Sequence, residues 1–217
     1  PATPYYWQVR IWTDEASCSD WSSPAQFETG LLFAHDWSGA QWIAHPLRSV
    51  ASAGSAPGDS VTPRPLLRGS ILVTKPVKRA RVYATAHGLY QLSLNGRKVG
   101  DQFLAPGWTD YPRRTQTQTY DVTALLQTGE NVLGVALGDG WYRGKVGLGW
   151  HNLYGDTLAV MAKLRVTYAD GSTEDFNTNG RWRSSEGPFV QADLQDGESY
   201  DARRMQGRLA SNDREKL

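Results

Sequence analysis

The residues best suited to chemistry lie in the turn Gly138–Gly144, which reads Gly-Asp-Gly-Trp-Tyr-Arg-Gly. Its glycines let the backbone turn sharply and approach a ligand closely. Asp139 offers a hard oxygen that hydrogen-bonds hydroxyl groups or ligates Ca²⁺. Trp141 and Tyr142 offer faces on which a sugar ring stacks. In the structural alternative, the glycines shape a strand crossover and Asp139 caps backbone amides.

A second polar and aromatic cluster is the segment Pro-Gly-Trp-Thr-Asp-Tyr, which contains Trp108, Asp110 and Tyr111. Trp108 joins Asp139, Gly140, Trp141 and Tyr142 as a candidate carbohydrate-binding residue. In the alternative interpretation, the Pro-Gly pair sets a turn and Trp108 closes one end of the core.

A calcium site is the metal chemistry that the sequence favours. The candidate ligands are Asp139, Asn152 and Asp156, which would meet at one pole of a sandwich, with Asp139 partly exposed. Ca²⁺ takes six to eight oxygens, so backbone carbonyls would have to complete the shell. The four histidines show no metal-ligand spacing. Cys18 is the single cysteine, which excludes an intrachain disulfide and a Cys-rich metal site.

No residue is assigned a catalytic role. Hydrolysis of a glycosidic bond needs a pair of carboxyl groups, but the acidic residues here fall mostly in hairpin turns or solvated edges, as Asp170 does. The glycine-rich stretch Gly144–Gly149 lacks the Lys-Ser/Thr ending of a phosphate loop. Serines beside glycine show no nucleophile-elbow pattern.

The composition indicates a globular protein and excludes two classes of partner. Of 217 residues, 40% are hydrophobic and 21% charged, and the net charge is +1. The absence of a basic run argues against nucleic-acid binding. No apolar run reaches the roughly 20 residues that span a bilayer, so no membrane partner is expected. The nine Trp and ten Tyr serve either a sandwich core or sugar platforms. The start lacks signal-peptide features, but we expect it to be internal to a larger protein, so the compartment stays undetermined.

Many short alternating segments predict an all-β fold, an antiparallel β-sandwich of jelly-roll-like type. Asn95-Gly96 and Asp170-Gly171 fit tight hairpin turns, because these residues accept positive φ. One helical turn is expected over Val122–Leu126, and Ser49–Pro65 is expected to be a loop. The expected strands are Leu66–Val73, Arg79–Ala86, Leu89–Leu94, Thr115–Asp121, Asn131–Leu137, Leu158–Tyr168, Thr173–Phe176, Trp182–Ser185 and Phe189–Ala192.

The pattern of the first 30 residues predicts an isolated hairpin. Apolar residues at every second position, Tyr5, Trp7, Val9 and Ile11, would lie on one face of it. Such a hairpin is at best marginally stable in water. We therefore expect that it depends on strands beyond residues 31–217, either earlier in the same chain or in a partner domain.

Three motifs occur in a specific order within the sandwich segment. They are the hairpin Ala84–Gly96, the loop Leu104–Tyr111 with Leu-Ala-Pro-Gly-Trp-Thr-Asp-Tyr, and the turn Leu137–Gly144. This order resembles the N-terminal β-sandwich module of bacterial α-L-rhamnosidases. The leading hairpin, with its Trp-Ser-x-Pro step and its ending Phe-Glu-Thr-Gly, resembles the last strands of a fibronectin-III-like domain. The predicted organisation is 1–32 for the hairpin, 33–204 for the sandwich and 205–217 for a solvated tail.

The resemblance implies a parent enzyme that hydrolyses terminal α-L-rhamnosides with inversion. In that family the catalytic carboxylates belong to a helical barrel further along the chain, so this chain is predicted to be inactive alone. Its partners would be rhamnose-containing carbohydrate and the remaining domains of the parent. The family also includes a rhamnose-binding module that uses calcium.

Two roles for the chain stay open, carbohydrate binding with or without calcium and a scaffold that buttresses the barrel. A sandwich from another multidomain glycosidase is a third possibility.

Overall fold

The computed structural model describes residues 1–13, 17–46 and 64–205. The chain divides into two compact units, Pro1–Ser38 and Gly39–Leu217. The domain boundaries expected after residues 32 and 204 stay predictions. The tail beyond residue 205 and all but the end of the expected loop Ser49–Pro65 lie outside the described residues. No described helix is long and apolar enough to cross a membrane.

The first unit is built on a two-stranded antiparallel sheet, β1 (Pro4–Trp7) and β2 (Ala25–Glu28), and ends in a 3₁₀ turn, η1 (Ala34–Trp37). Tyr5 pairs with Phe27, and their rings stack at 5.3 Å. Side chains on both strands of this hairpin remain exposed. Two strands bury too little apolar surface to be stable by themselves in water, so the hairpin's predicted dependence on further strands stands as a prediction.

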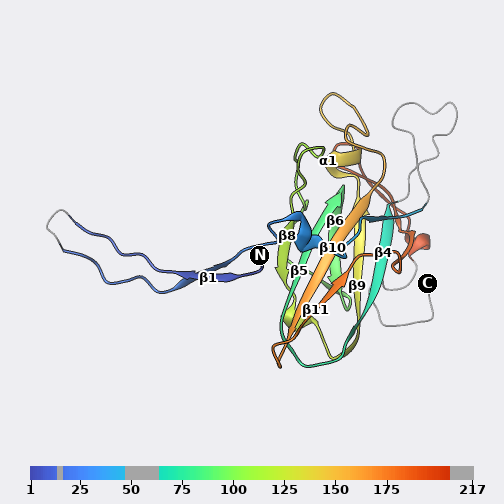
Figure 1. The fold of residues 1–217 in the computed structure, drawn as a ribbon. Helices are drawn as coiled ribbons and strands as arrows, with labels where there is room; N and C mark the ends of the chain where they lie inside the picture. The colour runs from blue at the N-terminus through green and yellow to red at the C-terminus, as the bar shows by residue number, and fades with distance from the viewer. Residues whose placement is uncertain (14–16, 47–63, 206–217) are drawn as a thin grey trace. The chain divides into compact units, whose positions relative to one another are not determined.

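The second unit confirms the predicted all-β antiparallel sandwich (Figure 1). In the first sheet the strand order is β11-β10-β5-β8, with β3 beside β10. In the second sheet it is β12-β4-β9-β6-β7. The first-sheet strands are β3 (Ile43–Ala44), β5 (Val77–His87), β8 (Gln118–Asp121), β10 (Ala159–Tyr168) and β11 (Thr173–Asn177). The second-sheet strands are β4 (Pro65–Val73), β6 (Leu89–Leu94), β7 (Arg97–Lys98), β9 (Gly129–Gly138) and β12 (Arg183–Glu186).

The core lies between the sheets, because alternate residues of each strand point to the same face. From the first sheet come Val82 on β5 and Leu164 on β10, which pair directly. From the second come Leu92 on β6 and Val135 on β9, which pair likewise. All four are buried. The sequence alternation thus specified both the strands and the face that each one buries.

The turn between β6 and β7 matches its sequence signal. Asn95 and Gly96 have φ values of 51° and 79°, the left-handed region that a two-residue hairpin requires. Nδ2 of the Asn95 side chain also donates to Oδ1 of the buried Asn131 at 2.8 Å. Nearby, Thr123–Leu125 forms a 3₁₀ turn, η2, where one helical turn was expected.

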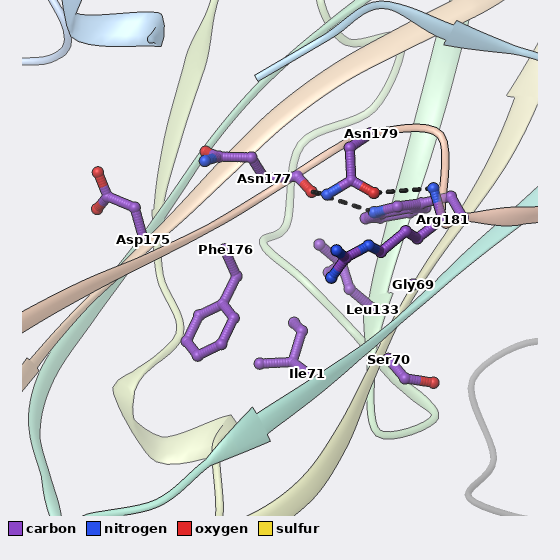
Figure 2. Close-up of a pocket in the computed structure, with 10 residues that line it drawn as sticks. Gly69, Ser70, Ile71, Leu133, Asp175, Phe176, Asn177, Asn179 and Arg181 are labelled. Atoms are coloured by element: carbon purple, nitrogen blue, oxygen red, sulfur yellow. Dashed lines mark hydrogen bonds between the residues drawn. The ribbon is translucent and has the colours of Figure 1, made fainter. Parts of the chain in front are cut away.

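The chain crosses between the two sheets at one lateral edge of the sandwich, from β11 to β12. This crossing leaves a cleft of about 240 Å³, shown in Figure 2. We call it the edge cleft and define it by Gly69, Ile71, Leu133, Phe176, Arg181 and Trp182.

One end of the sandwich carries a short helix, α1 (Gly140–Arg143), and the loop of residues 144–157 that follows it (Figure 1). Beside this end lies a separate two-stranded sheet of β13 (Phe189–Asp193) and β14 (Gly197–Tyr200). A hydrogen bond from the backbone N–H of Asp139 to Ala192 O, at 3.0 Å, joins β13 to this end of the sandwich. A last 3₁₀ turn, η3, spans Ala202–Arg204.

Candidate functional site

Aromatic side chains from five separate segments meet at the α1 end of the sandwich. We call this cluster the aromatic pole and define it by Trp42, His87, Trp108, Tyr111, Trp141, Tyr142 and Tyr154.

A continuous series of ring contacts runs across the pole. His87 stacks between Trp42, at 4.0 Å, and Tyr142, at 4.6 Å. Tyr142 meets Tyr111 edge-on at 5.2 Å, and Tyr111 meets Tyr154 at 5.0 Å. Pairs at these separations stabilise one another beyond their buried area. The series therefore joins β5, α1 and two loops into one packed layer.

The two tryptophans predicted to bind carbohydrate lie together at this pole. Trp108 and Trp141 are parallel within 4°, with ring centroids 6.3 Å apart. Nε1 of Trp108 donates to the Tyr154 hydroxyl at 3.1 Å. Trp108 is 52% exposed, whereas Trp141 and Tyr142 are half-buried. Trp108 is thus the member of this group with the most accessible ring.

Small residues make room for these rings. A β-carbon on Gly155 would lie 2.7 Å from Cζ of Tyr142, so the ring seats against bare backbone. Gly140 has a φ of +55° and faces Leu89 closely. The glycines of the turn therefore serve packing as well as backbone direction.

Burial favours the neutral forms of His87, Tyr111 and Tyr142 at the pole. Burial lowers the pKa of His87 below its usual 6.5. Burial, with the nearby Tyr154 and Tyr142, raises the pKa of Tyr111 to about 12. Burial likewise raises the pKa of Tyr142. At neutral pH the pole is therefore an uncharged aromatic surface.

Asp139 is at the pole, but its carboxylate faces two arginines. It is 2% exposed. Oδ1 accepts from Nε of Arg143 at 2.6 Å, and Oδ2 accepts from Nη2 of Arg64. Arg64 also donates through Nη1 to Val190 O at 2.8 Å. Burial lowers the pKa of Arg143, and Asp139 opposes that shift.

This arrangement differs from both sequence-based interpretations of Asp139. The partial exposure expected of a calcium ligand is not seen, and the side chain makes no capping bond to α1. The carboxylate instead joins β9, α1 and the start of β4.

The other two predicted metal ligands lie in the loop of residues 144–157. Asn152 is exposed, and its backbone N–H donates to Arg143 O at 2.9 Å. Asp156 is also exposed and accepts from the Thr157 hydroxyl at 2.8 Å. The fold thus brings both residues to the end of the sandwich that holds Asp139, while the oxygens of Asp139 are taken by guanidinium groups.

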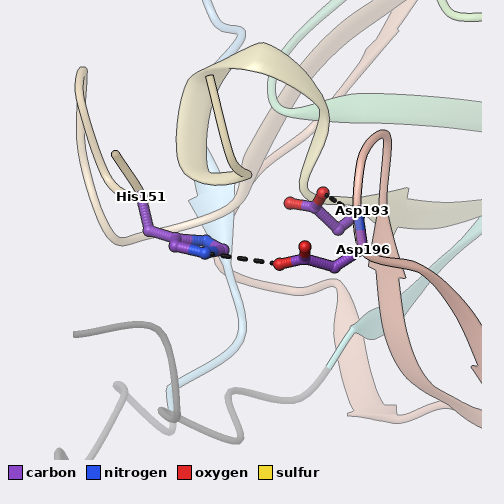
Figure 3. Close-up of side chains that lie close together, drawn as sticks. All are labelled: His151, Asp193 and Asp196. Atoms are coloured by element: carbon purple, nitrogen blue, oxygen red, sulfur yellow. Dashed lines mark hydrogen bonds and ion pairs between the residues drawn. The ribbon is translucent and has the colours of Figure 1, made fainter. Parts of the chain in front are cut away.

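A different side-chain group comes within metal-binding distance. The ligand atoms of His151, Asp193 and Asp196 all lie within 4.8 Å of one another, and Figure 3 shows them converging from the 144–157 loop and the β13–β14 turn. Lys145 Nζ already donates to Asp196 at 3.0 Å. Asp193 accepts backbone N–H groups from Lys145, Gln195 and Asp196. These bonds fasten the loop to the turn, and the lysine ammonium competes with any cation.

Sequence reasoning missed Arg64, His87, Trp42 and Tyr154. Arg64 is 75 positions from Asp139, and the aromatic partners are spread over more than half of the chain. Local spacing carries no signal for contacts of this kind.

An antiparallel sandwich with an aromatic pole and a buried carboxylate between two arginines places the chain in the class of β-sandwich modules. Residues 75–216 match the family model described as Alpha-L-rhamnosidase N-terminal domain, and the chain belongs to this family. Residues 1–33 match a model described as Rha78A-like, N-terminal immunoglobulin domain. The fibronectin-III-like assignment of the hairpin therefore stays a prediction.

Relatives with the name Alpha-L-rhamnosidase extend this finding. One from Streptomyces avermitilis is 44% identical over 192 residues, which make up 88% of this chain and 18% of the relative. One from Formosa agariphila is 38% identical over 202 residues, or 91% of this chain and 21% of the relative. The chain thus spans about a fifth of the length of the curated relatives it matches.

Solved structures agree with the sequence matches. The native α-L-rhamnosidase of Aspergillus terreus superposes with a TM-score of 0.86 at 36% identity, over 100% of this chain and 25% of that one. The α-L-rhamnosidase of Dictyoglumus thermophilum gives a TM-score of 0.85 at 33% identity, over 98% and 24%. The Streptomyces avermitilis enzyme complexed with L-rhamnose gives 0.84 at 26%, over 100% and 37%.

Proposed function

We propose that this chain is a non-catalytic N-terminal portion of a longer α-L-rhamnosidase, which hydrolyses terminal α-L-rhamnosides with inversion. The names of its relatives and its short span of their length support this proposal. Glycoside hydrolysis needs two carboxyl groups that reach the scissile bond. Asp139, the carboxylate of the motif turn, is buried and held by two guanidinium groups.

Within that parent, the proposed role of the sandwich is to dock on the remaining domains through its α1 end, where the 144–157 loop and the aromatic pole lie. The observation that carries this role is the apolar surface of the 144–157 loop. Leu148 is 96% exposed and Trp150 is 65% exposed, and Leu153 precedes Tyr154 of the aromatic pole. Large apolar side chains exposed together on one loop are typical of interaction sites. The aliphatic members favour a protein surface over a sugar, because sugars are bound mainly by aromatic faces and polar groups.

Binding of a rhamnose-containing carbohydrate at Trp108 and Trp141 is the second candidate. It is favoured by the parallel orientation of the two indoles and by the exposure of Trp108. Calcium assistance at Asp139, Asn152 and Asp156 belongs to this candidate. It would require the ion to replace two guanidinium groups at Asp139.

The test uses the full-length parent, recovered from its open reading frame, and this chain by itself. Leu148→Asp should lower the thermal stability and rhamnosidase activity of the parent while leaving the isolated chain unchanged. The matched control is Leu72→Asp, because Leu72 is also exposed but lies on β4 away from the loop. If both variants leave the parent unchanged, the docking role is refuted.

Calorimetric titration of the isolated chain with L-rhamnose separates the two candidates. Docking predicts no heat of binding at millimolar sugar. Binding that is lost in Trp108→Ala would instead establish the second candidate.

A further inference from the structure

We infer that the edge cleft is a second ligand site, which takes a single sugar ring bearing a carboxylate, of the hexuronate class. The site lies at the lateral edge of the sandwich and shares no residue with the aromatic pole. That the ligand is a sugar follows from the proposed function, whereas its charge and size follow from the cleft itself.

The size of the cleft suits one ring. Its volume of about 240 Å³ is below the ~300–1,000 Å³ of pockets for drug-sized ligands. Glycine at position 69 of β4 leaves room for the Trp182 indole, which forms one wall of the cleft. A β-carbon there would lie 2.7 Å from Cζ2 of Trp182, so the indole occupies the place of a core side chain.

The floor of the cleft is apolar. Ile71 on β4, Leu133 on β9 and Phe176 on β11 come from both sheets, and Trp182 adds its half-buried indole. The aromatic rings of Phe176 and Trp182 offer faces against which the C–H face of a sugar ring packs. A free inorganic anion has no such face and would leave this floor in contact with water.

The rim of the cleft is cationic. Figure 2 shows the Arg181 side chain directed over the floor. Arg181 is exposed and has no ion-pair partner among the residues that the structure describes. Asp175 is the single carboxylate of the lining, and it is already paired with Lys163 at 3.2 Å and Arg165 at 2.8 Å. Lys163 and Arg165 therefore offset the charge of Asp175, and Arg181 is the charged side chain of the lining that has no ion pair within the described part of the chain.

The backbone at Arg181 is held by bonds within the crossing from β11 to β12. The backbone N–H of Arg181 donates to Oδ1 of Asn179 at 2.9 Å, and Nδ2 of Asn179 donates to Asn177 O at 3.1 Å. The Thr178 hydroxyl donates to Gln41 O at 2.7 Å and ties the crossing to the segment before β3. These bonds hold the backbone from which the Arg181 side chain extends. Its guanidinium group suits a carboxylate, which it binds through two parallel hydrogen bonds.

The test is a nuclear magnetic resonance titration of the ¹⁵N-labelled chain with D-galacturonate, D-galactose and acetate. Galacturonate should shift the Trp182 Nε1 and Arg181 amide signals with a millimolar dissociation constant. Galactose and acetate should each bind at least about tenfold more weakly, because each lacks one of the two recognised features. Arg181→Gln should weaken galacturonate binding about tenfold. Arg97→Gln, which removes an exposed arginine from β7, should leave it unchanged.

Three results would overturn the inference. The first is an unshifted Trp182 signal across the millimolar range. The second is equal binding of galactose or acetate, and the third is full binding by Arg181→Gln with its fold confirmed by circular dichroism. None of these readouts involves the aromatic pole or the 144–157 loop. A negative result for the edge cleft therefore leaves the proposed docking role untouched, and refutation of the docking role leaves the edge cleft as a ligand site.

Discussion

Asp139→Asn should destabilise the sandwich strongly, although the two side chains have nearly the same shape. The carboxylate is 2% exposed and is the shared partner of Arg64 and Arg143, whose side chains are 9% and 6% exposed. Removing one member of a buried ion pair typically costs about 3–5 kcal/mol, because the remaining charge loses its compensation. Here two guanidinium groups lose their carboxylate at once, so the upper half of that range is expected.

The measurement is thermal unfolding of the isolated chain by calorimetry. For a chain of this size each kcal/mol shifts the melting temperature by about 2–4 °C, so a loss of roughly 8–20 °C is expected. Asp170→Asn is the matched control. Asp170 pairs with Lys75 at 2.8 Å on the surface, where solvent screens the interaction. If Asp139→Asn and Asp170→Asn change the melting temperature equally, Asp139 does not organise this end of the sandwich.

A double-variant cycle tests the same reasoning. Arg143→Met alone leaves Asp139 with Arg64, so it should cost less than Asp139→Asn. The two changes together should cost less than their sum, because they remove one shared interaction. Strict additivity would mean that the two side chains do not interact energetically.

Three further predictions concern metal, pH and activity. Neither calcium nor a chelator should shift the melting temperature, because the oxygens of Asp139 are occupied by guanidinium groups; a calcium-dependent increase at millimolar ion would contradict this. Burial lowers the pKa of His87 below 6.5, so the unfolded chain binds this proton at higher pH, and stability should fall as pH drops through 6.5. In His87→Phe, which keeps a ring between Trp42 and Tyr142, urea midpoints should fall less steeply over this pH range than in wild type or the exposed-site control His35→Phe. The purified chain should not hydrolyse an aryl α-L-rhamnoside, and turnover that survives removal of host enzymes would refute its non-catalytic assignment.

Several features of this protein were accessible from local sequence. The alternation along β10 gave both the strand and its buried face, because successive side chains of a strand point in opposite directions. Asn95-Gly96 gave the β6–β7 turn, because few other residue pairs accept two positive φ values. The ordered motifs of the hairpin, the Trp108 loop and the Gly138–Gly144 turn indicated the family, which the family model then confirmed.

The roles of individual side chains were decided only by the tertiary structure. In sequence, Asp139 between two glycines suggests an exposed oxygen ligand. Its burial depends on Arg64, 75 residues earlier, and on β13, about 50 residues later. One wall of the edge cleft likewise forms only where the Trp182 indole packs beside Gly69 of β4, a residue distant in sequence. The alternation of apolar residues and the residue preferences of turns depend on near neighbours, so both can be recognised in the sequence. Desolvation and charge pairing depend on which distant segments the fold brings together, so they are settled only when the sheets have packed.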